Sequence, residues 1–375
     1  MRQLAGWDWS CEHKLLFRNQ MGASLPEHQI VKPQKLAATA VGMLEQELVV
    51  PNLFQKQGID QFKGAENDTI SVPVEGVLPF HDYAWRNDRS KPIEFDEYKE
   101  RKIPVTFGGN VYSAVKVTDE QNDFDLKNWA KLLNPQVKAV ARGLGRRAVK
   151  TLTSQTYNVV IGQAARNLRG AIIEARRVVN KFNVPDEQRY LLVGSDFEAA
   201  LLGDDKLNLA QNVGDAEAQS ALRNALIADR WGFRIVVDKT IPSDAAYAMV
   251  TSAFIFLSGA PAVPQSIAFG ATQSHESIAL RWVRDYDPAY MHDRSVVNTY
   301  AGFRTVKDPL VGWDEAKNSE IVSEGEHFVR AIKLTLGGTS TYPPKDSELA
   351  KITGISDAAP WPPTSGQPAD ARAAK

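Results

Sequence analysis

The sequence predicts an α+β protein with at least two compact units. Stretches with apolar residues every three or four positions predict helices. They stand apart from runs in which apolar and polar residues alternate, the pattern of strands that bury one face. A single hydrophobic core stops growing at roughly 250–300 residues, and this chain has 375. We therefore expect more than one core, built from both helices and sheets.

The totals exclude several classes of protein. With 44 basic and 45 acidic residues, the chain has no overall field that would draw it to nucleic acid or a membrane, so any such contact must come from a local patch. The single cysteine, Cys11, excludes an internal disulfide and fits a reducing compartment. The apolar run at 15–17 is too short for a signal peptide, and the apolar segment 246–263 is short of a membrane span. We expect synthesis in the cytoplasm and no membrane partner.

Both ends of the chain are predicted to need a neighbour. Residues 1–30 have no clean period, yet they carry Trp7, Trp9 and Phe17, large apolar groups that need cover. The C-terminal segment is rich in Pro, Ala, Ser and Gly and would be disordered alone, although it carries Trp361. We expect the arm and the tail to be ordered only against other subunits.

A helix and a long two-stranded loop follow the arm. Apolar residues at helical spacing predict a helix that starts at Pro33 and stops before Pro51. The runs 69–77 and 102–107 predict two strands, each with a proline, which belongs at a sheet edge. The polar segment that connects these two strands is longer than the roughly 15 residues usual for a connection within a compact domain. Such a long connection favours a functional role. Since the chain offers no evident surface for this ribbon, residues 78–101 are expected to lie on a neighbouring subunit.

The longest helical pattern runs over 124–157. Asn134 is a good helix cap and Pro135 a good first helical residue, so we expect a short helix and then a long one. Gly143 and Gly145 lie inside the long helix at a cost of about 1 kcal/mol each and mark a place where it can bend. Basic residues repeat every four positions and form a stripe that faces either phosphate or solvent: Lys138, Arg142, Arg146 and Lys150.

From about residue 160 helices and strands alternate, which predicts a separate α/β unit. The expected elements are a helix at 163–181, a strand at 189–195, a helix capped by Ser195, a helix at 215–229, a strand at 232–239 and an apolar segment at 246–257. Alternating runs at 276–287 and 328–336 then predict further strands, at sheet edges.

The stretch RWVRDYDPAYMHDRS at 281–295 has two interpretations. One is the metal site of a hydrolase, because carboxylates two residues apart share one face of a strand and a turn at Pro288 returns further ligands to them. Its ligands would be Asp285, Asp287, His292 and Asp293. The other is a set of salt bridges, favoured because arginines match aspartates one for one, whereas a cation site carries an excess of carboxylate. The salt-bridge residues are Arg281, Arg284, Asp285, Asp287, Asp293 and Arg294.

The other sequence patterns that could indicate catalysis lack the structural context or the spacing that they require. GLGRRA at 143–148 has the glycine spacing of a dinucleotide-binding turn but lies within a predicted helix. VGSDF at 193–197 lacks the spacing of a nucleophilic serine turn. The six histidines are scattered, and no glycine- and lysine-containing phosphate loop is present. We therefore expect no enzyme activity and no cofactor.

The order of the elements resembles that of a known family. The chain begins with an arm and a helix, which are followed by a long two-stranded loop and by a long helix after NPQ. Next come an α/β unit with GFRIVVDKTIP and AFIFLSGAPAVP, and then IALRWVRDYDPAYMHDRSVVNTYAGFRTV. This order is similar to that of the major capsid proteins of tailed phages, which have the Hong Kong 97-type fold, and nearest to the coat proteins of short-tailed phages. The resemblance covers about residues 33–306 and is most specific at 280–302.

The resemblance implies a division of the chain. It places an N-terminal arm and helix at 1–64, an extended loop at 65–117, a peripheral domain with a spine helix at 118–160, an axial domain at 161–270, further peripheral strands at 271–340 with a small insertion near 307–326, and a C-terminal tail at 341–375. The expected contacts between subunits lie on the loop, through Trp85, Arg86, Arg89, Lys91, Phe95 and Tyr98.

The implied function is a structural shell subunit without catalysis. Copies would assemble as hexamers and pentamers into an icosahedral virion capsid around double-stranded DNA, which the basic stripe would contact without sequence preference. The implied partners are a scaffolding protein, a portal and a decoration protein, with assembly in the host cytoplasm. The alternatives are a bacterial nanocompartment shell of the same fold and the metal-dependent hydrolase described above.

Overall fold

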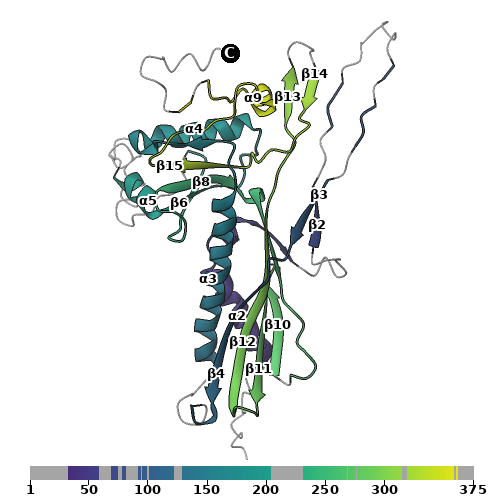
Figure 1. Cartoon of the computed structure of the whole chain (residues 1–375), viewed down its shortest axis with the longest axis vertical. Coiled ribbons are helices and arrows are strands. Elements are labelled where there is room, and N and C mark those ends of the chain that lie inside the picture. Colours follow the sequence, from purple (N-terminus) through teal and green to yellow (C-terminus); the bar gives the residue numbers. More distant parts are fainter. Residues whose placement is uncertain are drawn as a thin grey trace, which may run out of the picture.

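Two sheets and one long helix make up an elongated molecule (Figure 1). The computed structural model describes residues 33–58, 69–74, 78–81, 92–93, 95–98, 101–121, 129–203, 231–267, 269–275, 277–314, 319–358 and 360–361. A five-stranded sheet with helices lies at one end, a long six-stranded sheet with two helices at the other, and a two-stranded ribbon projects from the side. The α+β class predicted from the sequence is confirmed.

The six-stranded sheet is organised around its longest strand, β12 (His292–Thr305). In the order β1-β9-β12-β11-β10, its other strands are β1 (Gln55–Gly58), β9 (Phe254–Gly259), β11 (Ile278–Asp287) and β10 (Phe269–His275), and β4 (Asn110–Thr118) also pairs with β12. Helix α2 (Pro33–Glu47) packs on β10 and β11, and it ends before Pro51 as predicted. A 3-10 turn, η1 (Pro51–Leu53), leads from it to β1.

Helix α3 (Ala130–Ser154) is one continuous helix that passes through Pro135. The predicted break at Asn134 is therefore wrong, and the N-cap position falls at Trp129. Proline removes one backbone hydrogen bond, but the apolar positions on both sides of it, Leu133 and Val137, are buried on the same side of the helix. Packing against β4 and β12 thus outweighs the local preference for a break.

The five-stranded sheet lies at the centre of the second unit, and its buried residues belong to the same core as those of the six-stranded sheet and α3. Its order is β5 (Val160–Ile161), β15 (Ala331–Thr335), β8 (Ala245–Val250), β6 (Arg189–Val193) and β7 (Arg234–Val237). A 3-10 turn, η5 (Ala164–Arg166), precedes α4 (Leu168–Lys181), which buries Ile172, Ala175 and Val178. In α5 (Ser195–Leu202), Ser195 is the first helical residue and Gly194 takes the cap position. The helix predicted at 215–229 lies outside the described residues.

Two predicted domain boundaries are wrong. The apolar segment 246–257 was assigned to one unit, but a 3-10 turn, η6 (Thr251–Ala253), divides it. β8 then pairs with β6 and β15, whereas β9 pairs with β1 and β12 in the other sheet. The strand expected at 328–336 was assigned to the peripheral sheet, yet β15 pairs with β8 and β5. Every residue of β8 and β9 is buried, so their sequence has no period that could identify the correct sheet.

The predicted two-stranded ribbon is confirmed. β2 (Thr69–Val74) pairs with β3 (Arg101–Thr106) in an antiparallel sheet, and both prolines lie on edge strands. Val72 and Val105 pack on Ile255, Leu257 and Val306 of the same chain. A second two-stranded hairpin, β13 (Val311–Asp314) and β14 (Ser319–Val322), occupies the predicted insertion.

The C-terminal segment packs on its own subunit. It contains a short helix, α9 (Glu348–Thr353), and buries Tyr342, Leu349 and Ile355. The backbone carbonyl of Trp361 accepts a hydrogen bond from Ser340. The expectation that this segment is ordered only against neighbours is therefore wrong for residues 341–361, because its apolar residues find cover within the chain. The arm with Trp7, Trp9 and Phe17 lies outside the described residues.

The two glycines of α3 have different surroundings. A Cβ atom at Gly143 would lie 2.7 Å from Cγ1 of Val111 in β4, whereas a Cβ atom at Gly145 would meet nothing within 4 Å. Gly143 therefore allows close approach of helix and strand, which explains its presence without any bend.

This difference predicts opposite effects of two alanine substitutions. Gly145→Ala is expected to raise the free energy of unfolding by about 0.5–1 kcal/mol, because it removes the helix penalty of glycine. Gly143→Ala is expected to lower it by about 1–2 kcal/mol, because the added methyl group overpacks the contact with Val111. Urea unfolding of unassembled subunits measures both. Equal stabilisation by the two variants would contradict the close contact.

Candidate functional site

The stretch 281–295 forms the end of the β11–β12 hairpin. Asp285 lies opposite Arg294, Tyr286 opposite Asp293, and Asp287 opposite His292. Side chains of directly opposed residues lie on the same face of a sheet, and successive residues alternate between faces. Asp285 and Asp287 thus share one face with Arg294 and His292, whereas Asp293 points to the other.

Each of the three carboxylates forms an ion pair with an arginine. Arg294 lies 2.5 Å from Asp285 and 3.1 Å from Asp287, and all three are partly exposed. On the opposite face, Arg284 lies 2.6 Å from Asp293, which is buried. The Arg284 guanidinium also lies over the ring of Trp129 at the start of α3, 4.1 Å from its centroid.

Arg281 has different partners from those expected. Its Nε donates to the side chain of Asn298 at 2.9 Å, and its Nη1 donates to the backbone carbonyl of Ala262 at 2.8 Å. Arg281 therefore joins β11 to β12 and to the segment that precedes β10, through neutral acceptors.

The metal-site interpretation is wrong. Asp293 lies on the opposite face of the hairpin from Asp285 and Asp287, so the four predicted ligands cannot converge on one ion. Within the part of the chain that the structure describes, no three His, Cys, Asp or Glu side chains are grouped as metal ligands. The sequence had suggested the site because spacing along one strand does not reveal the register of its partner.

A buried polar junction lies beneath these ion pairs. Gln136 of α3 accepts a hydrogen bond from the Ser295 hydroxyl at 2.9 Å and donates to the Ser295 carbonyl at 2.9 Å. The same hydroxyl accepts from the indole nitrogen of Trp282 at 3.0 Å. All three side chains are at most 2% exposed. Sequence analysis missed Gln136, although a polar residue between the apolar Leu133 and Val137 of a helix was a usable signal.

The predicted basic stripe lies on the exposed side of α3. Lys138, Arg142, Arg146 and Lys150 are all exposed. Lys138 pairs with Glu47 of α2 at 2.9 Å. Arg147, outside the stripe, instead donates to the carbonyls of Gly108 and Gly109 and so ties α3 to the start of β4. The stripe therefore faces away from the sheet, as contact with phosphate or solvent requires.

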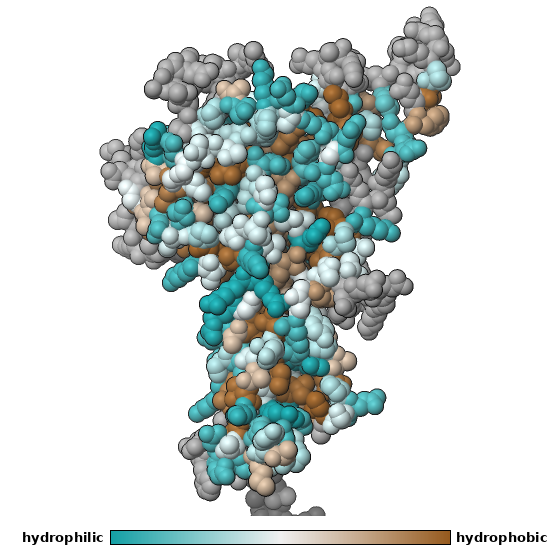
Figure 2. Space-filling model, viewed as in Figure 1, coloured by the Kyte–Doolittle hydropathy of each residue, from teal (hydrophilic) through white to brown (hydrophobic). Residues whose placement is uncertain are grey.

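The long loop exposes large apolar side chains. Ile93 is 64%, Phe95 93% and Tyr98 56% exposed, and Figure 2 shows hydrophobic side chains on the projecting part at the upper right. Trp85, Arg86, Arg89 and Lys91 lie outside the described residues. Within the described parts of the chain, no helix combines the length and apolar character needed to cross a membrane.

The base of the loop contacts its own subunit. Phe80 stacks on Trp313 of β13 with ring centroids 5.8 Å apart, and its backbone N–H donates to Glu320 of β14 at 2.9 Å. His81 lies 2.8 Å from Asp96 and joins the two limbs of the loop. The expectation that no surface of this chain supports residues 78–101 is thus wrong at residues 78–81, because the β13–β14 hairpin supplies one.

A family model described as phage capsid protein matches residues 106–309. The chain belongs to this family. The match spans β4, α3, most of the five-stranded sheet and the β11–β12 hairpin. No curated protein matches the chain. The family membership makes this chain a structural capsid protein of the virion.

Solved phage capsids share the fold. A structure titled "Mycobacterium phage Che8" has 15% identity and a TM-score of 0.54, over 78% of this chain and 92% of that one. The capsid of cyanophage P-SCSP1u has 12% identity and a TM-score of 0.51, over 75% and 89% of the two chains. The mature capsid of bacteriophage PhiM1 has 10% identity and a TM-score of 0.51, over 77% and 86%. The capsid protein therefore has the Hong Kong 97-type fold.

The two arginines of the hairpin should differ in their effect on stability. Arg284→Gln is expected to lower the free energy of unfolding by about 2–3 kcal/mol, because it leaves the buried Asp293 carboxylate without its cation. Arg294→Gln is expected to cost less than about 1 kcal/mol despite its two partners, because all three groups are at least partly exposed to solvent. Urea unfolding of unassembled subunits measures the difference, and a larger loss from Arg294→Gln would contradict it.

Proposed function

We propose that copies of this capsid protein assemble as hexamers and pentamers into a closed icosahedral shell around double-stranded DNA, without a catalytic step. The observation that carries the proposal is the apolar surface of the projecting loop. Phe95 is almost fully exposed on a segment that extends away from both sheets. Burial of apolar surface contributes about 25 cal/mol per Å², so such side chains favour association.

The loop is suited to reach a neighbouring subunit. Its base is held by the β2–β3 pairing, the Phe80–Trp313 stack and the His81–Asp96 contact, whereas the side chains of Ile93, Phe95 and Tyr98 are exposed. Aromatic residues are enriched among the side chains that dominate protein interfaces. The predicted contacts of Trp85, Arg86, Arg89 and Lys91, residues outside the described parts of the chain, belong to the same proposal.

The charged hairpin end supports the same function. Arg284, Arg294 and their three aspartates hold the end of β11–β12 in one geometry, and Tyr290 and Met291 at its turn are 76% and 68% exposed. Charge pairs specify register and orientation more than they add strength. A rigid end with exposed apolar residues suits a repeated contact between copies.

The basic stripe supports contact with the packaged DNA. Arg142, Arg146 and Lys150 are exposed along one side of a straight helix. Cations in such a row bind phosphates without reading sequence. If α3 bends at its glycines, the bend depends on Gly145, since Gly143 has a packing role.

The proposal also includes the other partners that the resemblance implies. A scaffolding protein, a portal and a decoration protein would act with the shell, and assembly would take place in the host cytoplasm. A nanocompartment shell of the same fold would hold protein cargo, so the content of purified particles separates the two functions. Negative-stain microscopy with nucleic acid analysis provides this test, and DNA-filled particles support the phage shell.

The loop contact predicts a strong assembly defect from one substitution. Phe95→Ser is expected to weaken association of subunits by about 30-fold, the effect of losing one interface hot spot. The matched control is Ile173→Ser, which changes an exposed apolar residue of α4. Size-exclusion chromatography and microscopy measure particle yield against subunit concentration. Normal assembly of the Phe95 variant, or an equal defect in the control, would refute the loop contact.

The stripe predicts weaker retention of DNA. Arg142→Gln with Arg146→Gln removes two phosphate contacts and is expected to reduce the slope of log binding constant against log salt by about 2. The control pair, Arg166→Gln with Arg169→Gln, removes the same charge from exposed positions near the start of α4. DNA release from particles is measured over a salt series. Equal release of DNA from the two double variants would show that the stripe is only a solvated face of the helix.

A further inference from the structure

The β13–β14 hairpin depends on contacts outside both large sheets. It forms a two-stranded sheet of its own, and among the described strands it pairs with no other. Isolated two-stranded hairpins are marginally stable in water. Its base is closed by Ser323, which exchanges backbone and side-chain hydrogen bonds with Leu310 at 2.8 Å. Its direction must therefore be set by whatever packs on it.

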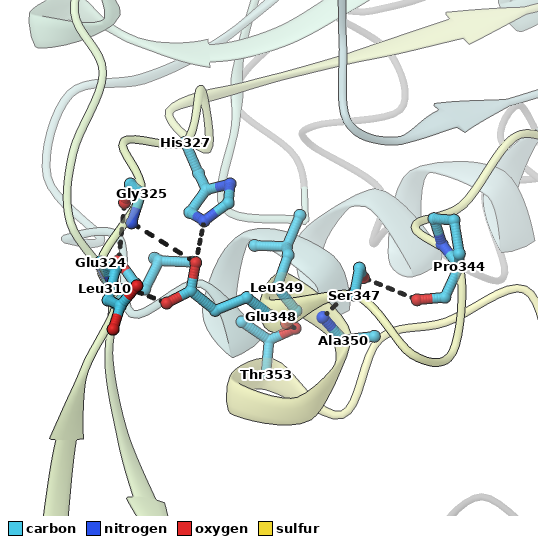
Figure 3. Close-up of polar contacts among 11 residues, drawn as sticks. Leu310, Glu324, Gly325, His327, Pro344, Ser347, Glu348, Leu349, Ala350 and Thr353 are labelled. Atoms are coloured by element: carbon cyan, nitrogen blue, oxygen red, sulfur yellow. Dashed lines mark hydrogen bonds and ion pairs between the residues drawn. The ribbon is translucent and has the colours of Figure 1, made fainter.

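Helix α9 supplies one such contact through Glu348 (Figure 3). The Glu348 carboxylate accepts hydrogen bonds from the backbone N–H groups of Glu324 at 2.6 Å and Gly325 at 3.4 Å, and it lies 3.3 Å from Nε2 of His327. These contacts hold the pKa of the Glu348 carboxyl below its usual range, and the hydrogen bond from the backbone N–H of Glu324 contributes most. The carboxylate thus binds the chain directly after β14 in its charged form.

Close packing supplies a second contact between α9 and the hairpin. A Cβ atom at Gly312 of β13 would lie 2.6 Å from Cγ2 of Ile352. Only glycine leaves room for the helix to lie this close to the strand. The hairpin is therefore held by α9 at β13 and at the chain that follows β14.

Helix α9 is in turn anchored to the five-stranded unit. The Ser347 hydroxyl caps the helix by accepting from the N–H of Ala350 at 3.2 Å, and it donates to the carbonyl of Pro344 at 2.6 Å (Figure 3). Before the helix, the hydroxyl of Tyr342 donates to Glu174 of α4 at 3.2 Å. Glu174 is buried and bound by two nitrogens of Arg177, each at 2.8 Å.

The contacts continue from the hairpin to the long loop. Phe80 stacks on Trp313 of β13, and its N–H donates to Glu320 of β14. An unbroken path of contacts thus runs from α4 through α9 and the hairpin to the base of the loop. Helix α9 itself is held by the core, in which Leu349 and Ile355 are buried. The contacts from Glu348 to the chain after β14 and from the hairpin to Phe80 are small and can open without unfolding either large sheet.

We propose that α9 is a clasp that sets the direction of the long loop. With Glu348 bound to the chain after β14, the hairpin is fixed and presents Trp313 and Glu320 to the loop. When the clasp opens, the hairpin and the base of the loop move together. The consequence for shell assembly rests on the proposed function, whereas the coupling is a property of the single subunit.

Hydrogen exchange of unassembled subunits tests the coupling. Glu348→Ala is expected to speed exchange about ten-fold in peptides that cover 319–327, because it removes a charged acceptor of backbone N–H groups. If the clasp sets the loop, exchange in peptides that cover 78–81 rises as well, although these residues do not touch Glu348. Glu348→Gln keeps an acceptor oxygen and is expected to have an intermediate effect.

Two further variants make the result decisive. Lys351→Ala changes an exposed residue of the same helix and is expected to leave both regions unchanged. Trp313→Ala is expected to speed exchange at 78–81 but not at 324–325, because it cuts the path beyond the clasp. Faster exchange at 319–327 in the Glu348 variants with no change at 78–81 would overturn the proposal, as would no change in either region.

Particle yield separates the clasp from the proposed function. If the loop directs assembly, the Glu348→Ala and Trp313→Ala variants both lower the yield of closed shells, and Lys351→Ala does not. Altered exchange with normal shells would support the clasp and refute the role of loop direction in assembly. Normal exchange with defective shells would refute the clasp alone.

Discussion

The hydrogen bonds around Ser295 hold together the part of the molecule on which the other surfaces depend. One hydroxyl joins Trp282 of β11, Ser295 of β12 and Gln136 of α3, all inside the core. A buried polar group without a partner costs about 1–3 kcal/mol, so a slip of either strand would leave several such groups unpaired. The junction therefore fixes the β11–β12 register, and this register aligns each arginine with its aspartate.

Aromatic packing joins the two sheets into one body. Phe254, at the start of β9, stacks on Phe54 at 4.7 Å on one side and meets Phe328 at 5.5 Å on the other. Phe328 contacts Tyr157 at 5.7 Å, and Tyr157 contacts Tyr247 of β8 at 5.6 Å. This row of rings crosses the turn where the chain passes from β8 to β9. The spine helix and the five-stranded sheet therefore share one continuous core.

The end of the β11–β12 hairpin and the long loop differ in how many contacts hold them in place. The end of the β11–β12 hairpin is held by ion pairs on both faces of two long strands, whereas the long loop leans on a small hairpin that α9 holds in place. The loop exposes several large apolar side chains, Phe95 above all. In the proposed shell, a firm point and an adjustable arm in one subunit would allow copies to meet in slightly different geometries.

The sequence by itself determined the class of fold, the ribbon with its prolines, the helix from Pro33 and the exposed basic stripe, because these depend on local periodicity and backbone chemistry. Only the tertiary structure decided which sheet receives β9 and β15. The fully buried β9 has no period that identifies a partner, and the partly exposed β15 pairs with strands far from it in the chain. The tertiary structure also decided that Asp293 faces away from Asp285, which removed the metal site, and that α3 continues through Pro135, since packing on β4 and β12 outweighs one lost hydrogen bond. The contact between Phe80 and Trp313 joins residues far apart in the chain, and no local pattern could reveal it.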